Sequence, residues 1–117
     1  MSELKWGIQN GDLDTVKNLV QKDEKIVNNE TEGGRFPLHI AADYGQTEVI
    51  EFLINKGAEV NKADKHGITP LLAAVWENHT SSVKLLLEKG ADKNVQSPDG
   101  TAVIDCAEKD EIKKLLS

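Results

Sequence analysis

The sequence predicts an all-α solenoid in which four helical hairpins stack along one axis. Similar runs of residues begin at Gly34, Gly67 and Gly100, so one motif recurs at a constant interval. A second motif, at residues 56–61, returns at residues 89–94 with the same spacing. Two motifs that repeat in phase, with a period between about 20 and 50 residues, are the signature of a stacked repeat protein.

Each repeat is predicted to open with a short inner helix. Pro37 and Pro70 stand at the expected first helical position. The N–H that proline lacks would have no partner within the helix there, and its fixed φ suits the helix. Thr69 can cap the second of these helices with its hydroxyl. Phe36 occupies the equivalent place before Pro37. The small alanines that follow each proline let neighbouring inner helices pack closely.

An outer helix is predicted to follow in each repeat, because apolar residues recur there at i, i+3 and i+4. The four stripes are Val16, Leu19 and Val20; Ile50, Leu53 and Ile54; Val83, Leu86 and Leu87; and Ile112, Leu115 and Leu116. Gly57 and Gly90 come after two of them and suit the left-handed conformation that ends many helices. No repeat can bury its stripe alone, so stability is expected to come from the interfaces between neighbours.

These signals predict a single domain, residues 1–117, with repeats at about 1–33, 34–66, 67–99 and 100–117. The first repeat contains a longer internal loop at residues 23–28, and the last is truncated, with a connector of Lys109 and Asp110. Residues 61–67 and 94–100 are expected to form projecting turns. Charged residues suit a polar end at the C-terminus, namely Glu108, Lys109, Asp110, Glu111, Lys113 and Lys114. Polar ends predict a monomer.

The chain resembles the ankyrin-repeat family, whose signature is Thr-Pro-Leu-His-x-Ala in a repeat of about 33 residues. One repeat keeps Pro37-Leu38-His39-Ile40-Ala41 and the next keeps Thr69-Pro70-Leu71. The resemblance implies a module that binds another protein in a concave strip, formed by the projecting turns and the exposed side of the inner helices. It also implies that His39 is a structural histidine bonded to the neighbouring turn.

The whole chain is also similar to a branch of this family made of small cytosolic proteins that contain only ankyrin repeats. The less generic matches are Glu32-Gly33-Gly34-Arg35 and Asp64-Lys65-His66. This resemblance implies binding to the heterodimeric actin capping protein, which is thereby kept off filament barbed ends. Rel-type transcription factors, or another signalling protein, are the alternative partners. The matching site positions are Trp6, Glu32, Asp43 and Glu77.

The repeat register extends this candidate site. In each of two repeats, two inner-helix residues that come after the alanines are expected to point into the strip. They are Asp43 and Tyr44 in one repeat and Trp76 and Glu77 in the next. Exposed aromatic residues commonly anchor interfaces. The predicted protein-binding residues are Trp6, Glu32, Arg35, Asp43, Tyr44, Lys65, His66, Ile68, Trp76 and Glu77. Trp6 is equally compatible with a role in covering the edge of the core.

Charge excludes some classes of partner. The formal net charge is −6, from 20 acidic and 14 basic side chains, so we expect neither nucleic acid nor an anionic membrane as a direct partner. A basic protein surface is favoured instead. The lone Cys106, the absence of a signal-peptide pattern at the start and the absence of a long apolar run indicate the cytosol, with the nucleus as a second location.

Few residues suggest chemistry. Cys106 could pair with His39, His66 or His79, but no known catalytic signature accompanies it, and a small buried hydrophobic role is favoured. His39 and Asp43 lie four residues apart, which could begin a metal site, yet no further ligands follow in pattern. We therefore expect no enzyme activity, no cofactor and no metal. A further alternative is an idealised stack without a natural target. Residues that depart from an idealised repeat, such as Phe36 and Asn78, argue against it.

Overall fold

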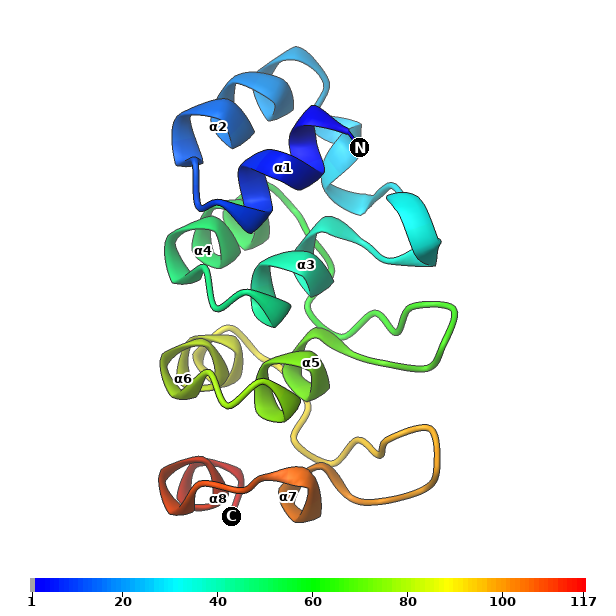
Figure 1. Ribbon diagram of the computed structural model, residues 1–117, viewed down its shortest axis with the longest axis vertical. Coiled ribbons are helices and arrows are strands. Elements are labelled where there is room, and N and C mark those ends of the chain that lie inside the picture. Colours follow the sequence, from blue (N-terminus) through cyan, green and yellow to red (C-terminus); the bar gives the residue numbers. More distant parts are fainter. Residues whose placement is uncertain (1) are drawn as a thin grey trace.

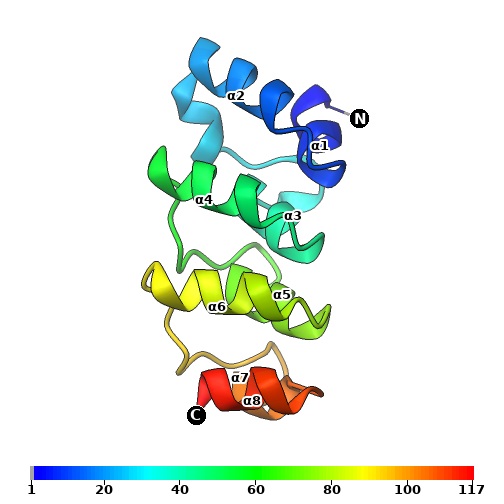
Figure 2. The ribbon, with the colours of Figure 1, turned by 90° about the vertical axis from the view of Figure 1, so that its left-hand side faces the viewer.

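The computed structural model describes residues 2–117, with residue 32 described by its backbone alone. Eight α-helices form two columns along the longest axis of a molecule of 39 × 24 × 22 Å (Figures 1 and 2). The inner column contains α1 (Glu3–Gln9), α3 (Pro37–Asp43), α5 (Pro70–Trp76) and α7 (Val103–Cys106). The outer column contains α2 (Leu13–Lys22), α4 (Thr47–Asn55), α6 (Thr80–Glu88) and α8 (Asp110–Leu116). Four stacked helical pairs confirm the predicted all-α solenoid.

The helix ends follow from the residues predicted to form them. Pro37 and Pro70 are the first residues of α3 and α5. The Thr69 hydroxyl accepts a hydrogen bond from the Leu72 N–H at 3.2 Å, whereas Phe36 supplies no such cap to α3. Gly57 and Gly90 have φ of 100° and 97°, a left-handed conformation that lets the chain turn away after α4 and α6.

The apolar stripes of the outer helices face the core. In each stripe two residues are buried and the third is half-buried. The buried members are Val16, Val20, Ile50, Leu53, Val83, Leu86, Ile112 and Leu116. Alanines of α3 and α5 are also buried, so the inner column packs closely against its neighbours. The core is therefore one continuous layer between the two columns.

The turns between repeats share one hydrogen-bond pattern. The N–H groups of Thr31, Asp64 and Ser97 donate to the carbonyls four residues later at 2.7, 2.9 and 2.8 Å. Gly34, Gly67 and Gly100 have φ of 74°, 78° and 89°. The repeat glycines thus fall at equivalent places, and the second and third turns project beyond the inner column on the same side (Figure 1).

Asparagine side chains join neighbouring repeats. The Asn28 amide donates to the Gly57 carbonyl at 2.8 Å and accepts from the Glu59 N–H at 3.0 Å. Asn61, at the equivalent position of the next repeat, makes the same two bonds, to the Gly90 carbonyl at 3.1 Å and from the Asp92 N–H at 2.7 Å. We refer to each as an asparagine clamp. Clamps of this kind hold successive loops in register.

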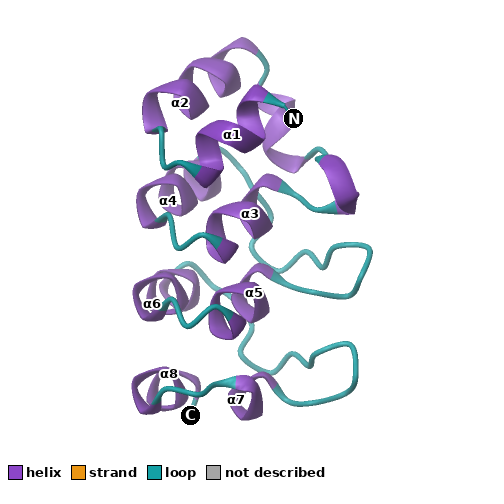
Figure 3. Ribbon diagram, in the orientation of Figure 1, coloured by secondary structure: helices purple, strands orange, loops and turns teal. Residues whose placement is uncertain are grey.

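Three local expectations need correction. Residues predicted as a loop in the first repeat form a short helical turn, η1 (Glu24–Asn28), because Val27 is buried against its neighbours. The connector of the last pair consists of residues 107–109, since Asp110 already begins α8. Cys106 is half-buried at the end of the four-residue α7, not a fully buried residue. As Figure 3 shows, helices and loops account for the described chain, apart from an isolated bridge between Gln96 and Ala102.

Candidate protein-binding face

Large hydrophobic side chains are exposed at three places in the described part of the chain. Trp6, Tyr44 and Trp76 are 47%, 48% and 43% exposed. Trp6 lies in α1, Tyr44 is the C-cap of α3, and Trp76 is the last residue of α5, so all three belong to the inner column. Half-exposed tryptophan and tyrosine side chains have the character of interface anchors.

The repeat register places candidate residues of successive pairs next to each other. Asp43 and Trp76 are separated by one repeat period, as are Tyr44 and Glu77, so each pair occupies equivalent positions in adjacent repeats. The His79 Nε2 atom lies 2.9 Å from the Asp43 carbonyl oxygen, which ties the loop after α5 to the end of α3. The ends of α3 and α5 therefore form one continuous part of the surface.

Trp6 differs from the other two aromatic residues in its place in the stack. It is the fourth residue of α1, and the fourth residue of α3 is Ile40, which is only 2% exposed. Helix α3 is covered by the first helical pair, whereas no described pair lies above α1. Trp6 is thus at the N-terminal end of the stack, where it can contact a partner as well as shield the core edge.

Arg35 organises the polar part of the face. Its Nη1 atom lies 3.0 Å from Oδ2 of Asp43, and its Nε atom lies 3.8 Å from Oδ2 of Asp64. The Asp64 side chain is fully buried, and its Oδ1 accepts from the N–H groups of His66 and Ile68 at 2.8 and 3.0 Å. Asp43 is consequently paired with a cation within the chain, which reduces its value as a free carboxylate for steering. Glu77, an exposed C-cap residue, has no such partner among the described residues.

His39 lies beneath this cluster and ties α3 to the next turn. Its Nε2 atom is 2.7 Å from the Ile68 carbonyl oxygen, so Nε2 carries the proton and donates it. Burial lowers the pKa of His39, and the bond to Ile68 and the charge of Asp64 oppose that effect. Nδ1 is buried and finds no partner in the described chain. His39 is a structural residue, as the resemblance implied.

The turn residues divide into exposed and packed ones. Lys65 and His66 are exposed, and the aliphatic stem of Lys65 crosses Gly34 so closely that a Cβ there would collide with Lys65 Cδ. Ile68 is half-buried and packs against the core, so little of it is available to a partner. The side chain of the predicted site residue Glu32 lies outside what the structure describes.

In the described part of the chain, no three His, Cys, Asp or Glu side chains come together as metal ligands. Nor does any helix of residues 2–117 have the length and apolar character needed to cross a bilayer.

Sequence reasoning missed two features of the structure. Asp64 stands in the predicted projecting turn of residues 61–67, and its burial beneath Arg35 depends on packing between repeats, which spacing does not reveal. An apolar hollow between α1, α2 and η1 was also missed, although the stripe residue Leu19 lines it.

Comparisons with known proteins agree with this architecture. A family model described as ankyrin repeats, in three copies, matches residues 4–97. Myotrophin of Xenopus tropicalis is 55% identical over 114 residues, which cover 97% of this chain and 96% of that protein. Myotrophin of Rattus norvegicus is 57% identical with the same coverage. The 2-5A-dependent ribonuclease of Homo sapiens is 34% identical over 67 residues, which make up 57% of this chain but 9% of that enzyme.

Proposed function

The chain belongs to the ankyrin-repeat family and, within it, to the proteins named myotrophin, and from that premise we propose that it sequesters the heterodimeric actin capping protein. The general role, a protein-binding ankyrin module, follows from the family. The proposal adds the partner and the outcome, which is the inhibition of barbed-end capping without any catalytic step. It treats residues 1–117 as one domain with repeats at about 1–33, 34–66, 67–99 and 100–117.

The observation that carries the proposal is the exposure of Trp6, Tyr44 and Trp76 along the inner column. The chain leaves these aromatic side chains half-exposed while its outer helices bury their apolar stripes. Such residues supply most of the binding energy at a typical interface, provided that the partner covers them. Arg35 joins this face through its ion pair with Asp43, Lys65 and His66 are exposed on a projecting turn, and Ile68 contributes only its exposed edge.

Charge indicates what kind of surface covers the aromatics. The chain carries a net charge of −6, and Glu77 is an exposed carboxylate beside Trp76. A basic surface would be attracted over distances of about a Debye length, roughly 8 Å at physiological ionic strength. Because the ion pair between Arg35 and Asp43 is internally compensated, we assign steering mainly to Glu77 and orientation to the Arg35 cluster.

The mechanism is competitive occlusion. If capping protein uses a basic surface to engage actin, a partner bound over that surface prevents engagement for as long as it stays in place. No covalent change in either protein is needed. Inhibition should then follow the occupancy of the complex and reverse on dilution.

Filament elongation from seeds capped at their barbed ends tests the proposal. Titration of this chain should restore barbed-end growth in proportion to the complex formed, and sedimentation or calorimetry should detect a complex with purified capping protein. Growth that stays blocked at a large excess of the chain, together with no detectable complex, would refute the proposal.

The acidic charge and the family also accommodate Rel-type transcription factors as partners, with a nuclear location in addition to the proposed cytoplasmic one. Affinity capture from cytosol and from nuclear extract separates the alternatives. Recovery of both capping-protein subunits supports the first partner. Recovery of Rel-type factors without those subunits supports the second.

A further inference from the structure

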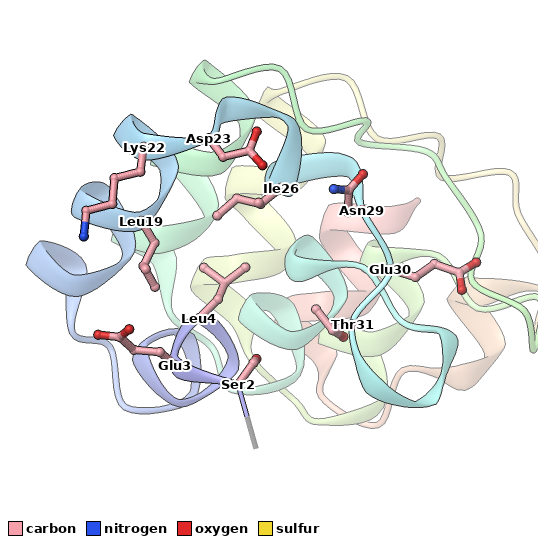
Figure 4. A pocket seen from close by; sticks show the side chains of 10 residues that line it. All are labelled: Ser2, Glu3, Leu4, Leu19, Lys22, Asp23, Ile26, Asn29, Glu30 and Thr31. Carbon is pink, nitrogen blue, oxygen red and sulfur yellow. The ribbon is translucent and has the colours of Figure 1, made fainter.

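An apolar hollow of about 620 Å³ opens at the N-terminal end of the stack, between α1, α2 and η1. Its floor is made by Leu4, Leu19 and Ile26, whose side chains point toward a common centre (Figure 4). The volume falls within the range of roughly 300–1,000 Å³ that is usual for ligand clefts. None of the residues predicted to form the protein-binding face lines it.

The hollow exists because the first helical pair has an uncovered side. Leu4 and Leu19 are half-buried, but the residues at the same positions of the next pair, Leu38 and Leu53, are 2% and 0% exposed. In the third pair, Leu71 and Leu86 are similarly buried, at 1% and 0%. These positions are therefore docking positions for a preceding layer. In the described chain the first pair presents them to solvent.

The rim of the hollow is acidic. Glu3, Asp23 and Glu30 line its edge together with a single cation, Lys22, and in Figure 4 the Glu30 carboxylate points outward from the floor. The ion pairs found among the described residues, which involve Arg35 and Lys62, do not include these three carboxylates. An apolar floor with an acidic rim is complementary to a peptide that carries apolar and basic side chains together.

We propose that this hollow is a second docking site, which takes apolar side chains from a basic segment of a partner protein. Leucine, methionine or aromatic side chains fill the floor formed by Leu4, Leu19 and Ile26, and flanking lysine or arginine residues meet the rim. A second copy of this chain fits less well, because each copy carries a net charge of −6 and is repelled by the rim. The site is independent of the aromatic face and of the partner proposed for it.

The test uses the full chain and a short synthetic peptide of lysine and leucine, with the leucines on one helical face. Backbone amide NMR should show saturable shifts centred on Leu4, Leu19 and Ile26. Replacing the peptide's lysines by glutamate, or its leucines by serine, should weaken binding by about tenfold or more. Shifts confined to Tyr44 and Trp76, or no shifts at all, would overturn the proposal.

Two charge variants distinguish attraction of the peptide by the rim of the hollow from attraction by the net charge of the chain. Glu3→Lys with Glu30→Lys, and Glu88→Lys with Glu111→Lys, each change two exposed glutamates, so both variants move the net charge by 4, from −6 to −2. Only the Glu3 and Glu30 pair of substitutions should weaken peptide binding by about tenfold or more. Unfolding midpoints should fall by similar amounts in the two variants, because each places one lysine in the first turn of a helix, at Glu3 of α1 or Glu111 of α8. Equal weakening in the two variants means that the rim has no local role and contradicts the proposal.

Two further controls complete the design. Trp76→Ala should leave peptide binding unchanged while it weakens binding at the aromatic face, so the loss of one site is measured separately from the loss of the other. Shifts at Leu4 and Leu19 that grow with protein concentration in the absence of peptide would show a second copy in the hollow and overturn the assignment to a basic partner.

Discussion

The Thr69 hydroxyl caps α5, and the equivalent residues Phe36 and Ala102 provide no such cap to α3 and α7. Thr69→Ala should lower the free energy of unfolding by about 1 kcal/mol, because the Leu72 N–H loses its partner. Thr69→Ser keeps the hydroxyl and should retain most of the stability. Urea denaturation measures both variants, and an equal loss in the two would mean that the methyl group matters and the cap does not.

His39 links stability to pH. Burial lowers its pKa below the ordinary value of 6.5, so His39 stays neutral in the folded chain at a pH where it already binds a proton in the unfolded chain. Protons therefore favour unfolding as the pH falls through the unfolded pKa, and this loss levels off below the folded pKa. His39→Gln retains a donor for the Ile68 carbonyl but cannot titrate. Urea midpoints from about pH 7 to about pH 5 should fall less in this variant than in the wild type, and parallel curves would contradict the prediction.

Trp76 is predicted to anchor the proposed complex. Because its side chain is 43% exposed, Trp76→Ala should leave folding intact and weaken binding to capping protein by about 2 kcal/mol or more. Trp6→Ala, measured alongside by calorimetry, tells whether the edge residue also contributes. Lys84→Ala, on the exposed side of an outer helix, serves as the control with unchanged affinity. Unaltered affinity in Trp76→Ala would remove this residue from the interface.

At the scale of the element, the asparagine clamps provide a matched comparison within one chain. Asn61 bonds to the loop of the next repeat at 3.1 and 2.7 Å, whereas Asn94 occupies the same repeat position with no described repeat beyond it. Asn61→Ala should cost about 1–2 kcal/mol of stability through the lost bonds and the unsatisfied groups left behind. Asn94→Ala should change the free energy of unfolding by no more than about 0.5 kcal/mol. Similar costs for both variants, by urea denaturation, would show that the clamp contributes nothing.

The sequence predicts well those elements that are determined by residues close together along the chain. Proline at the start of α3 and α5, the glycines after α4 and α6, and the i, i+3, i+4 stripes each depend on neighbours along the chain. The helical turn η1 was not predictable in this way, because Val27 is buried by contacts that its own segment does not encode. For the same reason the repeat register could not reveal that α7 has only four residues.

At the scale of the whole molecule, periodicity predicts the stack but not its surface. The repeat period places Asp43 beside Trp76 and identifies which positions lie outside the core. It does not show that Arg35 neutralises Asp43, that Ile68 packs inward, or that Leu4 and Leu19 stay uncovered, since each depends on distances between repeats or on the end of the stack. The positions of such a site can therefore be predicted from the repeat, but which of its side chains are free to bind a partner is known only from the packing in the structure.

The solenoid should open from its C-terminal end. Each of the two central helical pairs contacts two neighbouring pairs, whereas α7 and α8 contact one. Helix α7 has only four residues, and Ala102, its N-cap residue, supplies no side-chain cap. Stability in a repeat array is roughly a sum of repeat and interface contributions, so the last pair should open at a lower free energy than the centre. Native-state hydrogen exchange should then give the amides of α8 less protection than those of α5 and α6. The Asp105 N–H donates to the Ala102 carbonyl at 2.9 Å, so the hydroxyl that Ala102→Thr adds before α7 gives it a second acceptor, as the Thr69 hydroxyl does for Leu72. The substitution should raise protection in α7 and α8 by less than about 1 kcal/mol while leaving α5 unchanged. Uniform protection along the stack would mean that the four pairs open as one unit, and the interface at α7 would then be as strong as those at the centre.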